Sequence, residues 1–288
     1  MFPGFEVGRC KTSGSEIAFR KGGEGPPVLL LHGYPQTHVM WHKIAPGLAE
    51  SFTVVAADLR GYGDSGKPEG GDCHTNYSKR VMAQDQVELM AGLGFERFAV
   101  VGHDRGARVT HRMALDHPDR VEKAAVLDIA PTLTMFERTD MAFARAYYHW
   151  FFLIQPFDMP ERMIGSDPIY YLERKIGAWS RTDGAFTPEA LAEYKRCFDN
   201  PAMIHASCED YRAAAGIDLE HDRADADRRV ACPLLALWGD RGVVGQTYDV
   251  LATWREKAGD VRGKALDCGH YLPEEQPEET LKALLAFL

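Results

Sequence analysis

The fold is decided by the stretch Val100-Val101-Gly102-His103-Asp104-Arg105-Gly106-Ala107-Arg108, in which a short apolar run ends in a turn of small residues. Asp104 stands between two glycines with the spacing Gly-x-nucleophile-x-Gly. This spacing is typical of a strained turn from strand to helix, where only small flanking residues fit because the backbones crowd there. The stretch therefore predicts a strand over 98–102 and a helix over 105–116.

The residue at the centre of this turn is Asp104, where Ser or Cys would be expected for attack on a carbonyl group. A carboxylate attacks saturated carbon readily, and displacement there gives a covalent ester on the enzyme. Attack on an ester or amide carbonyl would give only an anhydride. The alternative is that Asp104 merely caps the following helix, since Asp is a favoured N-cap residue.

Outward from this turn, apolar runs alternate with helical patterns. The runs that predict strands cover 27–31, 52–57, 98–102, 121–127, 233–239 and 264–267, and helices are predicted over 77–93, 105–116, 247–257 and 274–288. Segments 5–9 and 16–21, around Ser13-Gly14, predict an edge hairpin. The alternation predicts a doubly wound parallel sheet, in which functional sites gather at the carboxyl ends of strands. Asp58, Asp104 and Asp128 all follow such ends.

The pattern changes between residues 131 and 227. Long helical stretches such as 141–154 and 189–198 occur with several prolines and without a convincing strand. We therefore predict a core domain made of 1–130 and 228–288, with a helical domain of 131–227 inserted after the sixth strand.

Composition limits the partners and the compartment. The formal charge of −9 argues against nucleic acid, so an anionic ligand would need specific local arginines. Six scattered cysteines without metal spacing indicate thiols in a reducing compartment. The first residues lack a basic and apolar leader, and no stretch approaches the length of a membrane span. We expect a cytoplasmic protein that binds neither membranes nor nucleic acid.

A histidine and an acid complete the predicted constellation. His270 follows a late strand, where the chain order nucleophile, acid, His places the base. In an aspartate enzyme this base activates the water that hydrolyses the ester. Two acids could orient it, Asp128 after the sixth strand and Asp240 after the seventh. Asp240 comes two residues early for a Gly-x-x-Asp arrangement counted from Gly239, so we favour Asp128.

With these residues in place, the chain resembles an α/β-hydrolase with a helical cap, and it is most similar to the fluoroacetate (haloacetate) dehalogenases. Epoxide hydrolases and haloalkane dehalogenases share the aspartate, but typically carry Trp directly after it, where this chain has Arg105. The matching residues are His103 to Arg108, Asp128 in Leu127-Asp128-Ile129, His149-Trp150, Tyr211 in Glu209-Asp210-Tyr211-Arg212, and Gly269-His270.

The resemblance implies an eight-stranded, mostly parallel sheet and a small 2-halocarboxylate substrate, with no metal or organic cofactor and a homodimeric assembly. Arg105 and Arg108, three apart, would clamp the carboxylate, because guanidinium binds carboxylate in a planar way. Without the resemblance, ion pairs would be the better interpretation of an isolated Arg-x-x-Arg. The backbone N–H groups of Tyr34 and Arg105 would hold the oxyanion that forms when water attacks the ester.

The departing halide needs donors in a dry pocket, and by resemblance His149, Trp150 and Tyr211 supply them. From the residues alone, the run 147–152 would be the aromatic core face of a cap helix. Adjacent residues on a regular helix point about 100° apart. Convergence of His149 and Trp150 on one ion therefore predicts a helix end or distortion there.

Two rival functions remain at this point. An epoxide hydrolase would use the same ester chemistry with tyrosines that protonate the epoxide oxygen, but would leave the two arginines without a task. The candidate tyrosines are Tyr147, Tyr148, Tyr170, Tyr171 and Tyr211. A ligand-sensing protein of the same fold would bind a ligand without turnover.

Overall fold

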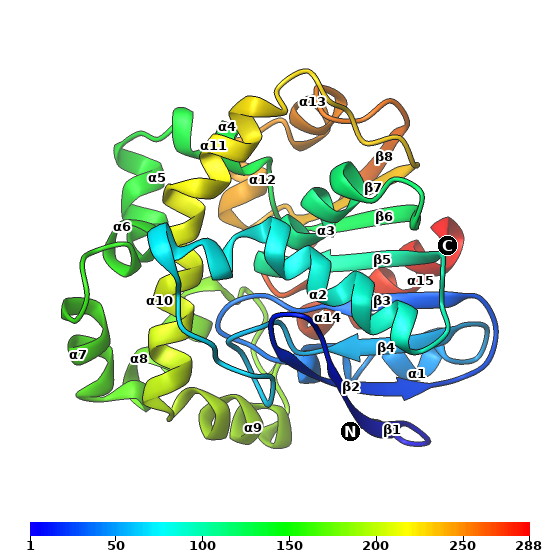
Figure 1. The fold of residues 1–288 in the computed structure, drawn as a ribbon, viewed down its shortest axis with the longest axis horizontal. Coiled ribbons are helices and arrows are strands. Elements are labelled where there is room, and N and C mark those ends of the chain that lie inside the picture. The colour runs from blue at the N-terminus through cyan, green and yellow to red at the C-terminus, as the bar shows by residue number, and fades with distance from the viewer.

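A computed structural model describes residues 1–288 and contains one eight-stranded sheet with the strand order β1-β2-β4-β3-β5-β6-β7-β8 (Figure 1). The strands β1 and β2 pair antiparallel, as do β2 and β4, and all other neighbours are parallel. This confirms the predicted, mostly parallel sheet. The strands are β1 (Glu6–Lys11), β2 (Glu16–Gly22), β3 (Pro27–Leu31), β4 (Thr53–Ala57), β5 (Phe98–His103), β6 (Val121–Leu127), β7 (Leu234–Gly239) and β8 (Val261–Leu266).

The burial of each strand follows its sequence pattern. Every residue of β4 and β5 is buried, as expected for continuous apolar runs covered on both faces. Strand β1 forms the predicted edge hairpin with β2 and is largely exposed. The polar groups at the carboxyl ends of the central strands are therefore carried on rigid, fully packed elements.

Helices cover both faces of the sheet. In Figure 1, α2 and α3 lie in front of the strands and α1 and α15 behind them. Helix α3 packs on β5 and β6, directly after the turn that carries Asp104. The helical elements of this part are η1 (His38–Trp41), α1 (Ala45–Leu48), η2 (Asp72–Tyr77), α2 (Lys79–Gly92), α3 (Arg105–Asp116), α12 (Val243–Thr247), α13 (Val250–Arg255), α14 (Leu272–Glu275) and α15 (Pro277–Phe287).

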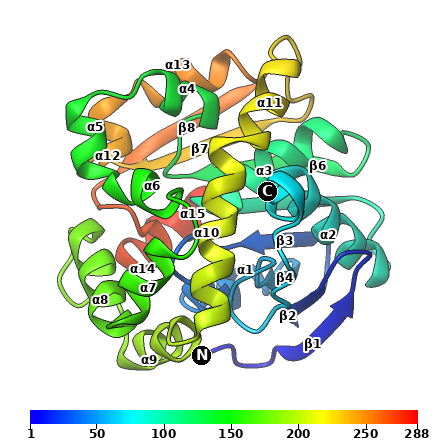
Figure 2. The same ribbon diagram turned by 60° about the vertical axis from the view of Figure 1, so that its left-hand side comes forward.

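Residues 131–227 contain eight helices and no strand, and they lie across the carboxyl ends of the parallel strands (Figures 1 and 2). The long helix α10 crosses this edge and contacts η2, α6, α7, α9 and α11. The helices are α4 (Thr132–Glu137), α5 (Met141–Ala146), α6 (Tyr148–Leu153), α7 (Met159–Gly165), α8 (Pro168–Trp179), α9 (Pro188–Phe198), α10 (Pro201–Ala215) and α11 (Ile217–Ala224).

Four predicted elements differ from the observed ones. The expected helix over 141–154 is two helices, α5 and α6, which meet at Tyr147. The expected helix over 247–257 is likewise divided between α12 and α13. The strand expected over 264–267 is β8, which begins three residues earlier beside β7. The expected helix over 274–288 is interrupted at Gln276, because Pro277 starts a new helix there.

Candidate active site

The turn at Asp104 is as crowded as its sequence predicts. Asp104 has φ 46° and ψ −112°, a strained conformation for a non-glycine residue. A Cβ atom added to Gly102 would lie 2.4 Å from the Gly106 carbonyl oxygen, and one added to Gly106 would lie 2.4 Å from the Leu31 carbonyl oxygen. The Asp104 side chain makes no capping hydrogen bond to α3, so the alternative that it merely caps this helix is wrong.

The two carboxylate oxygens of the buried Asp104 have different surroundings. Oδ1 accepts a hydrogen bond from the Tyr34 backbone N–H at 3.0 Å, whereas Oδ2 has no hydrogen-bond partner in the protein. Burial opposes ionisation, but His270 and then Arg108 more than offset it, so the pKa of Asp104 lies below its usual value. The result is a carboxylate with one held oxygen and one free oxygen.

His270 and Asp128 form the predicted pair. The Nδ1 atom of His270 lies 2.5 Å from Asp128 Oδ2, and Asp128 Oδ1 accepts from the Gly239 N–H at 3.0 Å. His270 Nε2 has no protein partner. Burial raises the pKa of Asp128, although the hydrogen bond from His270 acts in the opposite direction. The other candidate acid, Asp240, is exposed and makes no hydrogen bond to His270.

His103, directly before Asp104, connects the elbow to the base. Its Nε2 lies 2.7 Å from the His270 carbonyl oxygen, and the two rings lie 4.5 Å apart. Burial, together with His270, lowers the pKa of His103 to about 3, so its ring is neutral at ordinary pH. The neutral ring donates its Nε2–H to this carbonyl and fixes the loop that carries His270.

Arg108 is a buried cation without a carboxylate bonded to its guanidinium. Its Nη1 donates to the Thr132 hydroxyl at 2.9 Å and to the Ala130 carbonyl at 3.3 Å. The guanidinium carbon lies 4.7 Å from the centre of the Trp150 ring, and Nε has no protein partner. Burial, with Arg105 as the next contribution, lowers the pKa of Arg108.

Arg105, unlike Arg108, is bonded to a carboxylate. Its Nε and Nη2 donate to the two carboxylate oxygens of Asp210, each at 2.8 Å, and Nη2 also donates to the Asp210 carbonyl at 2.9 Å. The ion-pair alternative therefore holds for Arg105. Only Nη1 lacks a protein partner and remains for a ligand.

The three predicted halide donors lie together. The ring of His149 is 5.5 Å from that of Tyr211, and the Trp150 ring is 6.5 Å from Tyr211. All three side chains are buried, and both ring nitrogens of His149, Trp150 Nε1 and the Tyr211 hydroxyl lack protein partners. Burial, followed by Lys175, holds the pKa of His149 well below its usual value, so its ring is neutral and offers one N–H.

Two of these donors directly follow the break between α5 and α6. Tyr147, with φ −107° and ψ 30°, separates the two short helices, and His149 and Trp150 lie in the first turn of α6. The expected helix end is therefore present, but it lies before both donors and not between them. Adjacent side chains of α6 still point about 100° apart, and both rings nevertheless lie within 6.5 Å of the Tyr211 ring.

Two further residues border the site and were not predicted. The ring of Trp179, at the end of α8, lies 4.6 Å from the His270 ring and 4.7 Å from the His149 ring. The buried Lys175 Nζ stands 3.7 Å from the centre of the Trp179 ring and has no hydrogen-bond partner. Both lie in an ordinary amphipathic helix, and no motif in the sequence distinguishes them from packing residues.

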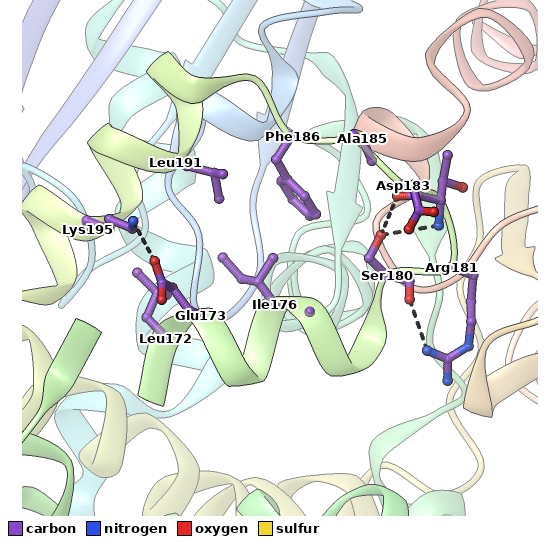
Figure 3. A pocket seen from close by; sticks show the side chains of 13 residues that line it. Leu172, Glu173, Ile176, Ser180, Arg181, Asp183, Ala185, Phe186, Leu191 and Lys195 are labelled. Carbon is purple, nitrogen blue, oxygen red and sulfur yellow. Dashed lines mark hydrogen bonds and ion pairs between the residues drawn. The ribbon is translucent and has the colours of Figure 1, made fainter. Parts of the chain in front are cut away.

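The reacting groups are closed off from the surface. Asp128, Trp179, Arg181 and His270 line a cavity of only about 10 Å³. A larger pocket of about 460 Å³ opens between α8, α9 and the loop that joins them, and Ile176 and Phe186 lie at its centre (Figure 3). Arg181 lines both cavities, but none of the predicted catalytic residues lines the larger one.

Three charged side chains at this outer pocket bond to their neighbours. Lys195 pairs with Glu173 at 2.6 Å, and the Arg181 guanidinium donates to the Ser180 carbonyl at 3.0 Å (Figure 3). No group of three or more His, Cys, Asp or Glu side chains in the chain is arranged to hold a metal ion.

Comparison with known proteins agrees with this geometry. The model of the α/β hydrolase fold family matches residues 26–277. A fluoroacetate dehalogenase from Burkholderia sp. is 49% identical, with 100% of this chain and 95% of that protein covered. A soluble epoxide hydrolase from Corynebacterium sp. (strain C12) is 35% identical, with 97% of this chain and 96% of that protein covered.

The same relationship is visible in three dimensions. The crystal structure of a protein from Nostoc sp. PCC 7120 that is assigned to the α/β hydrolases matches with a TM-score of 0.99 and 63% identity, over 100% of this chain and 99% of that one. The family model covers most of the chain and the sheet has the matching fold, so the chain belongs to the α/β-hydrolase family.

Proposed function

We propose that the protein hydrolyses small 2-halocarboxylates, such as fluoroacetate, to a 2-hydroxy acid and halide through an ester on Asp104. One observation carries the proposal: a buried carboxylate with a free oxygen lies within the electrostatic influence of two arginines that have unpartnered N–H groups. The guanidinium groups of these arginines lie against the rings of Tyr211 and Trp150, whose donors are also unpartnered. These groups match the two charged ends of such a substrate. The similarity to a fluoroacetate dehalogenase supports the same reaction.

In the first step, Arg105 Nη1 and Arg108 Nε bind the substrate carboxylate. Asp104 Oδ2, which has no protein partner, attacks the α-carbon opposite the halogen, forms a carbon–oxygen bond and inverts the configuration. The carbon–halogen bond breaks, and His149, Trp150 and Tyr211 receive the halide. Each such donor contributes roughly 3 kcal/mol, by analogy with single oxyanion donors.

In the second step, water hydrolyses the ester. His270 Nε2 takes a proton from the water, and Asp128 stabilises the resulting imidazolium through Nδ1. The water attacks the carboxyl carbon of Asp104. The oxyanion forms at Oδ1, where the Tyr34 N–H already donates. The backbone N–H of Arg105, the first residue of α3, is the proposed second donor.

Halide release tests this function. The purified protein should release fluoride from fluoroacetate and chloride from chloroacetate, and should leave a simple epoxide unchanged. Absence of halide release, with epoxide opening instead, would contradict the proposal.

Isotope labelling tests the ester. After a single turnover in heavy-oxygen water, the label should appear in the peptide that contains Asp104. Label found only in the hydroxy acid would exclude the covalent route and require direct attack by water.

The rival activity, epoxide hydrolysis, has support in the relative from Corynebacterium and in the unpartnered Tyr211 hydroxyl. Of the other tyrosines suited to it, Tyr148 and Tyr170 are 49% and 62% exposed and unsuited to a buried site. Tyr147 and Tyr171 remain, but the buried Arg108 would have no task. A ligand-sensing role predicts tight binding of a halocarboxylate without turnover.

We further propose that residues 131–227 act as a cap domain on a core of 1–130 and 228–288. The cap supplies His149, Trp150 and Tyr211, and the core supplies Asp104, Asp128 and His270. Neither part carries a complete site, so the proposed chemistry requires both.

The proposed assembly is a homodimer. Six of the nine exposed large hydrophobic side chains belong to residues 131–227: Met141, Tyr148, Phe157, Met159, Met163 and Tyr170. Such a concentration of exposed apolar side chains is typical of an interface. Analytical ultracentrifugation should give twice the mass of the chain, and a monomer at micromolar concentration would contradict the dimer.

The proposed location is the cytoplasm. All six cysteines are free, and Cys197, Cys208 and Cys268 are buried, as in proteins of a reducing compartment. No helix combines the length and the apolar character that a membrane crossing demands. Cell fractionation checks the location.

A further inference from the structure

A buried carboxylate, Asp210 on α10, stands behind the carboxylate-binding end of the site. Its two oxygens accept hydrogen bonds from three core side chains. Arg105 on α3 donates two of them, the Tyr62 hydroxyl donates at 2.6 Å, and Lys79 at the start of α2 donates to Oδ1. Asp210 is fully buried, and although burial opposes its ionisation, Arg105 and Lys79 hold its pKa far below the usual value.

These contacts fix the orientation of Arg105. A guanidinium has five N–H bonds in one plane. Asp210 accepts at Nε and at Nη2, and the Tyr211 ring covers the guanidinium face at 4.2 Å. The planar fork therefore cannot rotate, and Nη1 is left as the one unpartnered nitrogen, with its N–H bonds held in a fixed plane.

The same contacts remove the net charge of Arg105. Asp210 compensates it directly, and Lys79 is shared between Asp210 and Asp218, whose Oδ2 lies 3.4 Å from Nζ. Arg108, in contrast, bonds only to neutral groups, namely Thr132, Ala130 and Met135. The two arginines thus differ: Arg105 has a fixed orientation and a compensated charge, whereas the charge of Arg108 is not compensated by a bonded carboxylate.

We propose that Asp210 is a positioning residue for carboxylate recognition: it neutralises and orients Arg105, so that this arginine contributes the N–H bonds of Nη1 in a fixed direction while Arg108 carries the attraction for the anion. This inference rests on the proposed function, because it assigns a carboxylate to the space between the two arginines. In this proposal Asp210, a residue of the insertion, fixes the orientation of Arg105 in the core.

The pairing of Arg105 with Asp210 predicts which of two variants binds a carboxylate better. If Arg105 is truncated, Asp210 remains as a buried anion directed toward the same end of the site and repels an incoming carboxylate. Replacing both residues by neutral ones removes that repulsion, and a buried ion pair replaced in this way is often tolerated by the fold. The double variant should therefore bind a carboxylate better than the single arginine variant.

Acetate, a carboxylate without a leaving group, is a suitable probe, with binding measured by isothermal titration calorimetry at one pH. The variants are Asp210→Asn, Arg105→Met and the double variant with both changes. Asp210→Asn leaves the charge of Arg105 uncompensated but also frees its guanidinium to rotate. We expect the lost orientation to outweigh the added positive charge, so that acetate binding weakens about tenfold or more, the scale of one charge-assisted hydrogen bond. Arg105→Met should bind more weakly still, and the double variant should recover part of that loss.

The chain offers a matched control. Arg60 Nε and Nη2 bond to the two oxygens of Asp85 at 2.7 and 2.8 Å, and both side chains are buried. This pair has the same buried, bidentate geometry as Arg105 and Asp210, but it includes none of the proposed site residues. Asp85→Asn should leave acetate binding within about twofold of the original, a difference of under about 0.5 kcal/mol.

Two results would overturn the inference. One is unchanged acetate binding in a folded Asp210→Asn variant, and the other is a double variant that binds no better than Arg105→Met. If Asp210→Asn does not fold, the comparison of Arg105→Met with the double variant decides alone. A failure of the proposed function would be recognised separately: the unmodified protein would bind acetate but release no halide from a haloacetate.

Discussion

In the proposed reaction, the side chain of Asp104 determines the class of reaction, and its neighbours determine the substrate. A carboxylate in the crowded turn would direct the chemistry to saturated carbon. Arg105 and Arg108 on α3 would add the recognition of an anion, and the aromatic donors of the insertion would bind the leaving group. Each of these roles leads to a different expectation when its side chain is replaced.

Trp150→Phe removes one N–H from the proposed halide site. Fluoride needs this stabilisation more than chloride, because fluoride is the poorer leaving group. We expect kcat for fluoroacetate to fall roughly a hundredfold, from a loss of about 3 kcal/mol, and kcat for chloroacetate to fall less. Ion-selective electrodes measure both rates.

Trp41→Phe is the matched control, because Trp41 is also fully buried with an unpartnered Nε1 but belongs to η1. Its effect should be equal for the two substrates. Equal losses in Trp150→Phe would count against a halide role.

Asp128→Asn leaves the first step intact and impairs the second. Without the carboxylate, the His270 imidazolium is not stabilised, so the ester on Asp104 accumulates. We expect kcat to fall by about 10⁴, as for comparable acids of catalytic triads. Intact-protein mass spectrometry should detect the chain plus substrate minus halide. Asp240→Asn, the other candidate acid, should accumulate nothing.

Whether a site residue could be predicted from the sequence depends on how far apart in the chain its contacts lie. The motif positions Asp104, Asp128 and His270 follow strand ends, which are visible in the sequence. The Arg105–Asp210 contact joins residues 105 positions apart and leaves no local pattern. Trp179 and Lys175 were missed for the same reason, since only the tertiary fold brings α8 against His270.

At the scale of elements, the strands could be predicted well because burial on both faces produces continuous apolar runs. The helix boundaries of the insertion could not, because the break at Tyr147 depends on packing against other helices. Tyr147 itself has ordinary helical propensity. Its ring stacks on Phe143, four residues earlier, at 4.7 Å, but it also meets Trp179 of α8 at 5.1 Å, a long-range contact that no short window of sequence contains.

The turn between β5 and α3 provides a test of backbone crowding. Gly106→Ala puts a methyl group against the Leu31 carbonyl, so we expect a loss of about 1–3 kcal/mol in the free energy of unfolding. Gly177→Ala in α8 meets nothing within 4 Å and should add about 1 kcal/mol through helix propensity. Urea denaturation measures both. A stable Gly106→Ala would mean that the turn is looser than described.

At the scale of the molecule, stability should depend on pH through Glu274, a buried residue of α14. The Tyr194 hydroxyl donates to its Oε1 at 2.6 Å, and Lys43 Nζ lies 3.6 Å from Oε2. Burial raises the pKa of Glu274 to about 7, against partial opposition from these neighbours. The folded protein therefore holds a proton that the unfolded chain has lost.

A raised pKa in the folded state makes stability fall as pH rises, between the unfolded value near 4.5 and the folded value of about 7. Glu274→Gln removes this titrating group. The free energy of unfolding of the variant, relative to that of the original protein, should therefore rise by at most about 3 kcal/mol from about pH 5 to about pH 8. Urea denaturation at the two pH values measures the change. Parallel pH profiles for the two proteins would show that Glu274 titrates normally.

The burial of the reacting groups also affects the turnover rate. Asp104, His149 and His270 expose 3% or less of their surface. We therefore expect substrate to enter and product to leave through a shift of the insertion against the core. Bond breaking and this shift run in series, and the slower one limits turnover. With fluoroacetate the strong carbon–fluorine bond should limit the rate, whereas with bromoacetate the shift should.

Added glycerol separates the two regimes, because friction slows the movement of a domain and not the breaking of a bond. We expect kcat for bromoacetate to fall as viscosity rises and kcat for fluoroacetate to stay level. A viscosity effect on neither substrate would mean that exchange is fast in spite of the burial. In such an enzyme, selection for speed on an easy substrate would act on the mobility of the insertion, and selection on a hard one would act on the donors that it carries.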